Sequence, residues 1–297
     1  MAALDVIPHL NPSTTSGVIR NSAVIPNECE GSNDRIQQQF YQKQSGLTLV
    51  ELIAVIIVLA IVGTIGFGFV GNTMETYAST IERGKLVAKG RAALERMARQ
   101  LRGAAPNSIR ITGNCVEFLP VAGGGNYIGD VPDTANGAAP SGSAVTTPIA
   151  TAPHAVSLWT ARYVVIGALD EAELYDTQVS LADLAGRTAT SLTLTADKQW
   201  LRNSLNRRFY LVDNPQAFCV TAGSLRFHAS GYATPSTSTG TPAGAGDLMA
   251  GGVSVAAPFV LSPGTEDRNA TLSMSLQFSE GGEGIVLNQE VLIRNVP

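Results

Sequence analysis

The chain has 297 residues, enough for one large domain or two small ones. Only 15% of its residues are charged and 44% are apolar, while 30 glycines and 15 prolines favour strands, turns and loops over helices. A formal charge of −4, without any run of lysine and arginine, argues against nucleic-acid binding over the whole surface.

The first 46 residues are polar and slightly acidic, with four acidic and three basic side chains. Residues 11–16, Asn-Pro-Ser-Thr-Thr-Ser, have the composition of a disordered chain. Only Arg35 and Lys43 lie near the end of this segment, in agreement with the excess of basic residues on the cytoplasmic side of membrane helices. A start codon further downstream would leave much of the segment untranslated, and the sequence is compatible with both arrangements.

The next segment is an apolar run, since the 19 residues 52–70 carry no charge. As a helix they would span about 28 Å, the thickness of the hydrocarbon core of a bilayer. The apolar part of a secretory signal peptide is shorter, about 7–15 residues, and a core helix of a soluble protein normally has a polar face. We therefore predict that residues 52–70 form a transmembrane helix.

Glu51 directly precedes this run. A carboxylate costs about 2.5–3.5 kcal/mol at the centre of a membrane helix and less near its end, so its presence indicates a function and a charged partner. If the chain is cut after Gly46, Leu47 carries a new α-amino group, and Glu51 lies one helical turn further on. Its carboxylate can then neutralise that amine, in its own chain or in a neighbouring copy.

The stretch Gly46-Leu-Thr-Leu-Val-Glu-Leu-Ile53 resembles the class III signal of type IV pilins and type II secretion pseudopilins. The resemblance implies that a prepilin peptidase removes residues 1–46 as a leader and that Leu47 is N-methylated. It also implies that Glu51 guides docking into a growing filament. The leader is long for this family, and Leu47 differs from the Phe or Met most common at the first mature position. An ordinary single-pass anchor is the alternative.

The helical pattern continues beyond residue 70, as far as the stop signal of Gly103 and Pro106. Apolar residues at mostly three- and four-residue spacings form one stripe, namely Tyr77, Ile81, Gly84, Val87, Leu94, Met97, Ala98 and Leu101. Basic and acidic residues occupy the opposite face, and a solvated surface explains them better than a contact with phosphate groups. We predict one helix over residues 47–103, whose second half packs on a sheet.

Residues 104–297 alternate strand-like runs with turn-rich stretches. The runs are residues 108–112, 115–119, 163–166, 191–195, 209–212, 218–221, 224–228, 271–278 and 285–293. A long N-terminal helix followed by mostly antiparallel strands predicts an α+β fold, here resembling the type IV pilin fold. Residues 123–153 and 232–252 are rich in Gly, Pro, Ser and Thr, so we expect large surface loops there that bury no core.

The three cysteines are Cys29, Cys115 and Cys219. A cut after Gly46 removes Cys29 and leaves a pair, both members of which lie in strand-like runs. If this part of the chain crosses the inner membrane, it enters an oxidising compartment, where we expect a disulfide worth about 4–5 kcal/mol in the chain-entropy model. Two separate buried thiols are the alternative.

Several patches narrow the resemblance to the MshO family of minor pilins in MSHA-pilus biogenesis, which is related to the J-type pseudopilins. These patches are residues 107–110, 115–120, 218–220, 223–226 and 288–297. The two predicted loops carry no such match.

No constellation typical of an enzyme is found. His9, His154 and His228 lie far apart in sequence, and neither a zinc-protease motif nor a nucleophile elbow occurs. The acidic residues Asp170, Glu171, Glu173 and Asp176 have the oxygen chemistry of a calcium site but not the spacing of a known loop, so we favour a solvated turn or short helix. Arg202, Arg207 and Arg208 form a weak basic patch. We expect neither a cofactor nor a bound metal.

The resemblance implies a single-pass protein of the bacterial inner membrane with a periplasmic domain, later part of a pilus at the cell surface. Its partners would be other minor and major pilins, the prepilin peptidase, the inner-membrane assembly platform and, before assembly, the membrane. No nucleic acid is expected. A pseudopilin at the tip of a type II secretion pseudopilus and a surface adhesin are the alternatives.

Overall fold

The computed structural model describes residues 46–143, 145, 147–156, 160–230, 232, 235, 242–264 and 268–294. The chain divides into two compact units, residues 1–65 and residues 66–297, which are described separately. Helix α1 (Leu49–Arg102) contributes residues to both of them. Apart from Gly46, the predicted leader, with Cys29, lies outside the described residues.

The described part of the first unit, residues 46–65, is exposed throughout. Its helical residues are apolar around the whole circumference, with Thr64 as the one polar side chain after Glu51. The Thr64 hydroxyl donates a 2.9 Å hydrogen bond to the Ile61 carbonyl, which satisfies its polar group within the helix itself. An apolar helix surface of this kind requires a lipid or protein environment.

In the second unit the last part of α1 packs on two antiparallel sheets. Its buried residues recur at spacings of three and four, and they are Leu86, Gly90, Ala93, Leu94, Met97, Ala98 and Leu101. The predicted stripe is wrong at Tyr77, Ile81 and Gly84, which are exposed, whereas Val87 is half-buried and the predicted residues from 94 onward are buried. These three residues are exposed because the sheet that covers the helix ends near residue 83. Arg83 pairs with Glu283, which lies next to the turn of the hairpin in that sheet.

One of these sheets is built on the hairpin of β14 (Ala270–Glu280) and β15 (Glu283–Ile293). The short strands β12 (Val253–Ser254) and β13 (Phe259–Ser262) pair with successive stretches of the other edge of β14. Phe278, Leu276, Met274 and Leu272 alternate along β14 on the buried face, as expected for a strand with one solvated side.

The second sheet has the order β1-β2-β9-β10-β11. Its strands are β1 (Arg110–Thr112), β2 (Cys115–Phe118), β9 (Gln216–Thr221), β10 (Ser224–His228) and β11 (Asp247–Gly251). Both sheets and α1 share one hydrophobic core.

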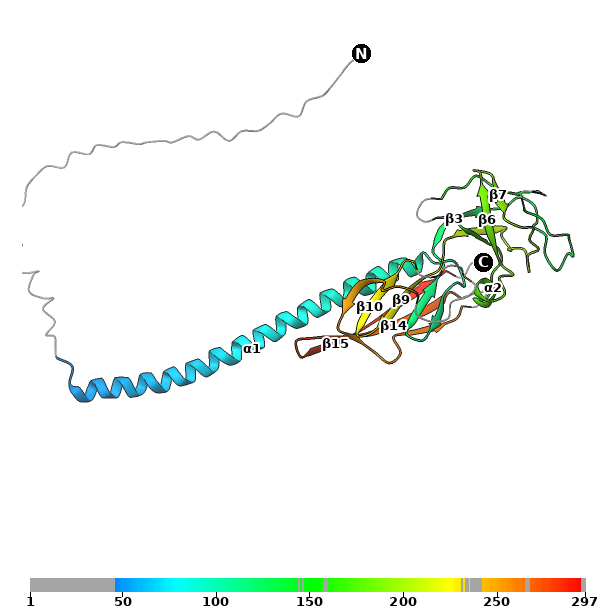
Figure 1. Cartoon of the computed structure of the whole chain (residues 1–297). Helices are drawn as coiled ribbons and strands as arrows, with labels where there is room; N and C mark the ends of the chain where they lie inside the picture. The colour runs from blue at the N-terminus through cyan, green and yellow to red at the C-terminus, as the bar shows by residue number, and fades with distance from the viewer. Residues whose placement is uncertain are drawn as a thin grey trace, which may run out of the picture. The chain divides into compact units, whose positions relative to one another are not determined.

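The 97 residues between β2 and β9 form a third, six-stranded antiparallel sheet of order β3-β8-β5-β6-β7-β4. Its elements are β3 (Val121–Asn126), β4 (Ile149–Ala150), β5 (Tyr163–Val165), α2 (Ala172–Tyr175), β6 (Leu181–Arg187), β7 (Ser191–Leu194) and β8 (Arg208–Val212). A separate core around Trp200, Phe209 and Leu211 stabilises this part, which we call the inserted lobe. Figure 1 shows β3, β6 and β7 grouped apart from β9, β10, β14 and β15.

The α+β fold predicted from the sequence is confirmed, and each predicted run contains a strand. The prediction of coreless loops at 123–153 and 232–252 is wrong. Gly123, Gly124 and Gly125 lie in β3, and Tyr127 and Ile149 are buried in the lobe core. A glycine strand gives no β-propensity signal, yet glycine is required here, because a Cβ on Gly124 would lie 2.8 Å from the Phe209 carbonyl oxygen. The second segment likewise contributes β11 to the five-stranded sheet.

Candidate functional site

The start of α1 is a capped helix N-terminus. The Thr48 hydroxyl accepts a 3.3 Å hydrogen bond from the Glu51 backbone N–H, and the Thr48 carbonyl accepts one of 3.1 Å from Leu52. Thr48 is thus the N-cap, and Glu51 occupies the third helical position of a Thr-x-x-Glu capping sequence. This role of Thr48 was not predicted, although the Thr-x-x-Glu spacing indicates it.

The residues predicted to act together lie at this helix start. Gly46 and Leu47 are the two residues before the cap, and Glu51 lies in the first turn. Leu47 is 68% exposed, and apart from the adjacent residues no atom of the described part of the chain lies within 4 Å of the position that a Cβ on Gly46 would take. The Glu51 carboxylate is in the first turn of the helix, where the positive end of the helix dipole favours a negative charge.

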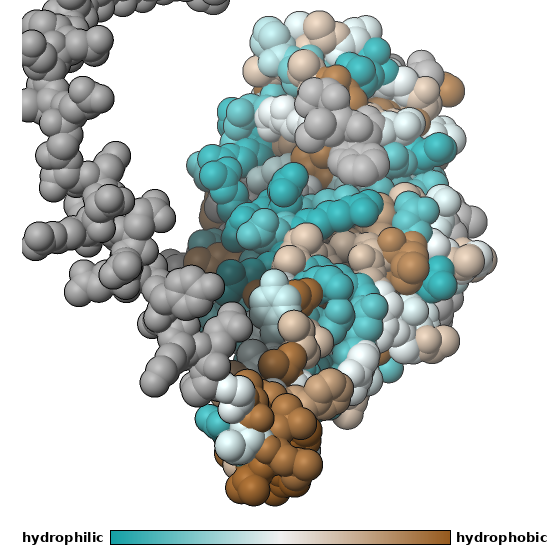
Figure 2. Space-filling model, turned by 90° about the vertical axis from the view of Figure 1, so that its left-hand side faces the viewer, coloured by the Kyte–Doolittle hydropathy of each residue, from teal (hydrophilic) through white to brown (hydrophobic). Residues whose placement is uncertain are grey.

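Exposure of apolar side chains extends far along α1. Every described residue from 46 to 78 is exposed. Figure 2 shows apolar side chains, in brown, gathered in one dense patch. Within the described part of the chain, α1 is long and apolar enough to cross a membrane by length and composition. Helix packing against lipid or against other apolar helices is the environment that such a surface favours.

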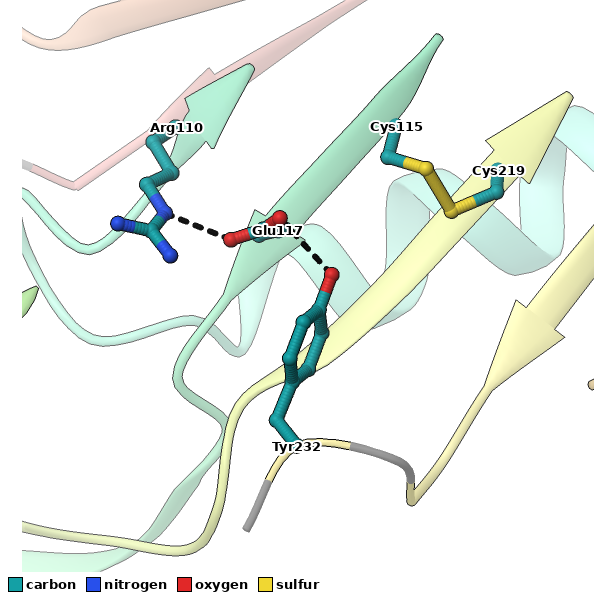
Figure 3. The surroundings of a disulfide bond; sticks show 5 residues. All are labelled: Arg110, Cys115, Glu117, Cys219 and Tyr232. Carbon is teal, nitrogen blue, oxygen red and sulfur yellow. Dashed lines mark hydrogen bonds and ion pairs between the residues drawn. A yellow bond between two sulfur atoms is a disulfide. The ribbon is translucent and has the colours of Figure 1, made fainter. Parts of the chain in front are cut away.

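The predicted disulfide is present in the second unit. Cys115 in β2 and Cys219 in β9 are directly opposite one another in register, with Cα atoms 4.1 Å apart, and their sulfur atoms are bonded. Both cysteines are buried. The bond joins the strand that leads into the inserted lobe to the strand that returns from it (Figure 3).

A buried charge lies two residues beyond Cys115. Glu117 has no exposed surface, and its carboxylate accepts hydrogen bonds of 2.6 Å from Arg110 Nε and 2.8 Å from the Tyr232 hydroxyl (Figure 3). Burial, followed by the bond to Glu117, raises the pKa of Tyr232 well above its usual range, so the phenol remains a donor. The Arg110 guanidinium also covers the Tyr175 ring, 4.0 Å from its centre.

This network of Arg110, Glu117 and Tyr232 was not predicted from the sequence. One signal for it exists, because Arg110 and Glu117 are opposite charges at equal distances from the turn between β1 and β2. Tyr232 gave no signal, since it lies in a segment that was predicted to be a surface loop.

Carboxylates of the acidic cluster around α2 accept hydrogen bonds from neighbouring parts of the lobe. Glu173 accepts 2.7 Å hydrogen bonds from Arg202 and Ser180, and Asp170 accepts a 3.1 Å hydrogen bond from the Ala172 backbone N–H. Among the described residues, no group of three or more His, Cys, Asp or Glu side chains is placed to hold a metal ion. Two residues of the weak basic patch also form ion pairs, because Arg202 pairs with Glu173 and Arg207 pairs with Asp130.

The two described histidines lie in different parts of the second unit. His9 lies outside the described residues, His154 contacts Phe209 in the lobe, and His228 is buried in β10 beside Gly246.

Comparison with known proteins addresses the N-terminal part of the chain. Residues 41–67 match the Prokaryotic N-terminal methylation motif. Neither a curated protein nor a solved structure matches the chain. The motif contains the class III prepilin signal, so it supports the type IV pilin and pseudopilin family and a structural subunit rather than an enzyme. It implies processing by a prepilin peptidase and assembly with other pilins, and with the apolar helix it suits anchoring in the inner membrane.

Proposed function

We propose that the chain is a minor pilin of an MSHA-like type IV pilus, placed at or near the tip and supporting surface attachment. In this proposal residues 1–46 are a leader removed by the prepilin peptidase, residues 47–103 are the pilin helix with its transmembrane part at 52–70, and residues 104–297 form a periplasmic domain. The observation that carries the proposal is the methylation motif on an exposed, capped helix start that is followed by an uncovered apolar helix.

The driving force of assembly would be transfer of the α1 surface from lipid to a filament of packed helices. Apolar packing supplies much of the interaction, and small residues such as Gly63, Gly66 and Gly71 permit close helix approach. The methylated α-amino group of Leu47 would pair with Glu51 of a neighbouring subunit. In a low-dielectric environment, a paired charge is favoured strongly over an unpaired one.

The inserted lobe supports a position near the tip. It adds 97 residues with their own core to the helix-and-sheet body, and such bulk is most easily accommodated where no further subunit follows. The patches that resemble the MshO family support the assignment to an MSHA-like pilus.

Mass spectrometry of the mature protein tests the proposal directly, with N-methylated Leu47 as the expected first residue. A Glu51→Ala variant should be processed normally but should not enter the pilus. Glu75→Ala, which removes an exposed carboxylate elsewhere on α1, is the matched control and should be incorporated. Any other first residue, or normal incorporation of Glu51→Ala, contradicts this mechanism.

A minor pseudopilin of a type II secretion system is the second candidate, because the methylation motif serves both assemblies. Neighbouring genes separate the two, since genes for pili and for secretion form distinct clusters. A surface adhesin is the third candidate. It predicts variants with normal pilus numbers and reduced attachment, and these must be surface substitutions, because deletion of residues 123–153 would remove β3 and β4.

A further inference from the structure

The seven basic residues of α1 differ in their contacts. Arg83, Lys85 and Lys89 each form an ion pair, with Glu283, Glu82 and Glu280 respectively, at 2.6–2.9 Å. Further along, Arg91, Arg96, Arg99 and Arg102 are exposed and form no ion pair with the described residues. Arg96 instead covers the Phe227 ring, 5.5 Å from its centre. Arg91, Arg99 and Arg102 have spacings of eight and three, which place these three on one side of the helix over about 16 Å. We call these three residues the arginine row.

A pocket of about 170 Å³ adjoins the row at the C-terminal end of α1. Arg99, Gln100 and Gln216 supply its polar lining, while Phe118, Pro120 and Val121 supply its apolar lining. Gln216 is 2% exposed. The Oε1 atoms of Gln100 and Gln216 are buried and accept no hydrogen bond from the part of the chain that the structure describes. Buried carbonyl oxygens without a donor are unfavourable, so this pocket favours a ligand that brings donors.

The pocket lies at the neck of the inserted lobe. The chain enters the lobe at Pro120 and Val121, and it returns at Gln216. The Val121 N–H donates to the Gly103 carbonyl at 3.1 Å, and the Asp213 N–H donates to the Pro120 carbonyl at 3.2 Å, so helix end and both neck segments are held together.

Interaction with the helix dipole accounts for the presence of basic residues at Arg99 and Arg102, in the last turn of α1. It does not account for a basic residue at Arg91, three turns before Arg102. It also leaves the two carboxamide oxygens without donors. A single small anion would reach one end of a row about 16 Å long. A ligand that carries several negative charges and N–H donors satisfies both features.

We propose that the arginine row and the neck pocket bind an acidic peptide segment of a neighbouring pilin subunit. A carboxylate of that segment accepts hydrogen bonds from Arg99, its backbone N–H groups donate to the carboxamides of Gln100 and Gln216, and further carboxylates pair with Arg91 and Arg102. This inference rests on the proposed function, because it takes for granted that other subunits pack beside α1.

The test uses the full chain in cells that assemble the pilus. In one variant Arg99→Gln and Arg102→Gln are combined; its control combines Arg83→Gln and Lys85→Gln, which removes the same charge from ion-paired positions. A photoreactive residue is placed at position 102 and, for comparison, at position 85. We expect normal processing and disulfide formation in all variants, but incorporation reduced about tenfold for Arg99→Gln/Arg102→Gln relative to the control. Position 102 should cross-link to an Asp- or Glu-rich peptide of a pilin, identified by mass spectrometry.

Equal incorporation of both variants, or a cross-link that reaches no pilin, overturns the inference. Normal pilus numbers with lost binding of alginate would instead assign the surface to an acidic polysaccharide, and would overturn it too. A failure of the proposed function is recognised separately, because the wild type and the control would then also be absent from pili.

Discussion

The Tyr232 hydroxyl and the Glu117 carboxylate, 115 residues apart in sequence, are joined by a 2.8 Å hydrogen bond in the interior of the second unit. This bond connects the segment after β10 to β2, the strand that carries Cys115. A buried carboxylate requires such donors, and here Arg110 and Tyr232 supply one to each oxygen.

Replacement of Tyr232 by Phe should therefore lower the free energy of unfolding by about 1.5–3 kcal/mol, because one oxygen of a buried carboxylate loses its donor. Urea unfolding of the full chain in detergent measures the change. Tyr77→Phe, at an exposed position of α1, is the control and should stay within about 0.5 kcal/mol of the wild type. Equal stability of the two variants would contradict the claim that the hydrogen bond between Tyr232 and Glu117 stabilises the fold.

Removal of the disulfide by combining Cys115→Ser and Cys219→Ser should cost about 4–5 kcal/mol, since the bond closes a loop with a sequence separation of 104 residues. The same unfolding measurement applies, and wild-type protein kept in reductant should behave like the variant. If the double variant and the reduced wild type both had the unfolding midpoint of the oxidised wild type, the disulfide would not stabilise the fold by lowering the entropy of the unfolded chain.

Gly90 sets the distance between α1 and the β14–β15 hairpin. A Cβ there would collide with the Leu287 side chain and would lie 2.9 Å from Cε2 of Phe278. Gly90→Ala should therefore lower the free energy of unfolding by about 1–3 kcal/mol through overpacking. Gly84→Ala is the matched control, because nothing lies within 4 Å of its Cβ position, and it should stabilise the helix by up to about 1 kcal/mol. The same sign for both substitutions would refute this explanation.

His228 should make stability depend on pH. Burial, and then the charge of Arg226, lowers the pKa of His228 in the folded chain, although Asp247 opposes the shift. The unfolded chain therefore takes up a proton near pH 6.5 while the folded chain does not, so the free energy of unfolding falls as the pH drops below about 6.5. Unfolding curves at about pH 7.5 and about pH 5.5 measure this loss. His228→Gln should reduce the slope, and an unchanged slope would point to other groups.

The N-terminal site could be predicted from the sequence because its signals are local. Residues 46–53 and the charge-free run that follows fix the methylation motif, the helix and its apolar surface, all of which depend on neighbours within one or two helical turns. Cysteine number likewise predicted the pair that forms the disulfide. The long strands β14 and β15 were predictable for the same reason, since alternation in sequence sets the two faces of a strand.

Tertiary structure alone decided the rest. The burial of α1 begins at Leu86 and not at Tyr77 because a hairpin almost two hundred residues later ends near Arg83. The glycine strand β3, the core of the inserted lobe and the Glu117–Tyr232 bond arise from pairings between distant segments, whose local composition resembles that of loops. The sequence by itself therefore determined the methylation motif and the apolar helix, whereas long-range packing determined which surfaces the folded second unit presents.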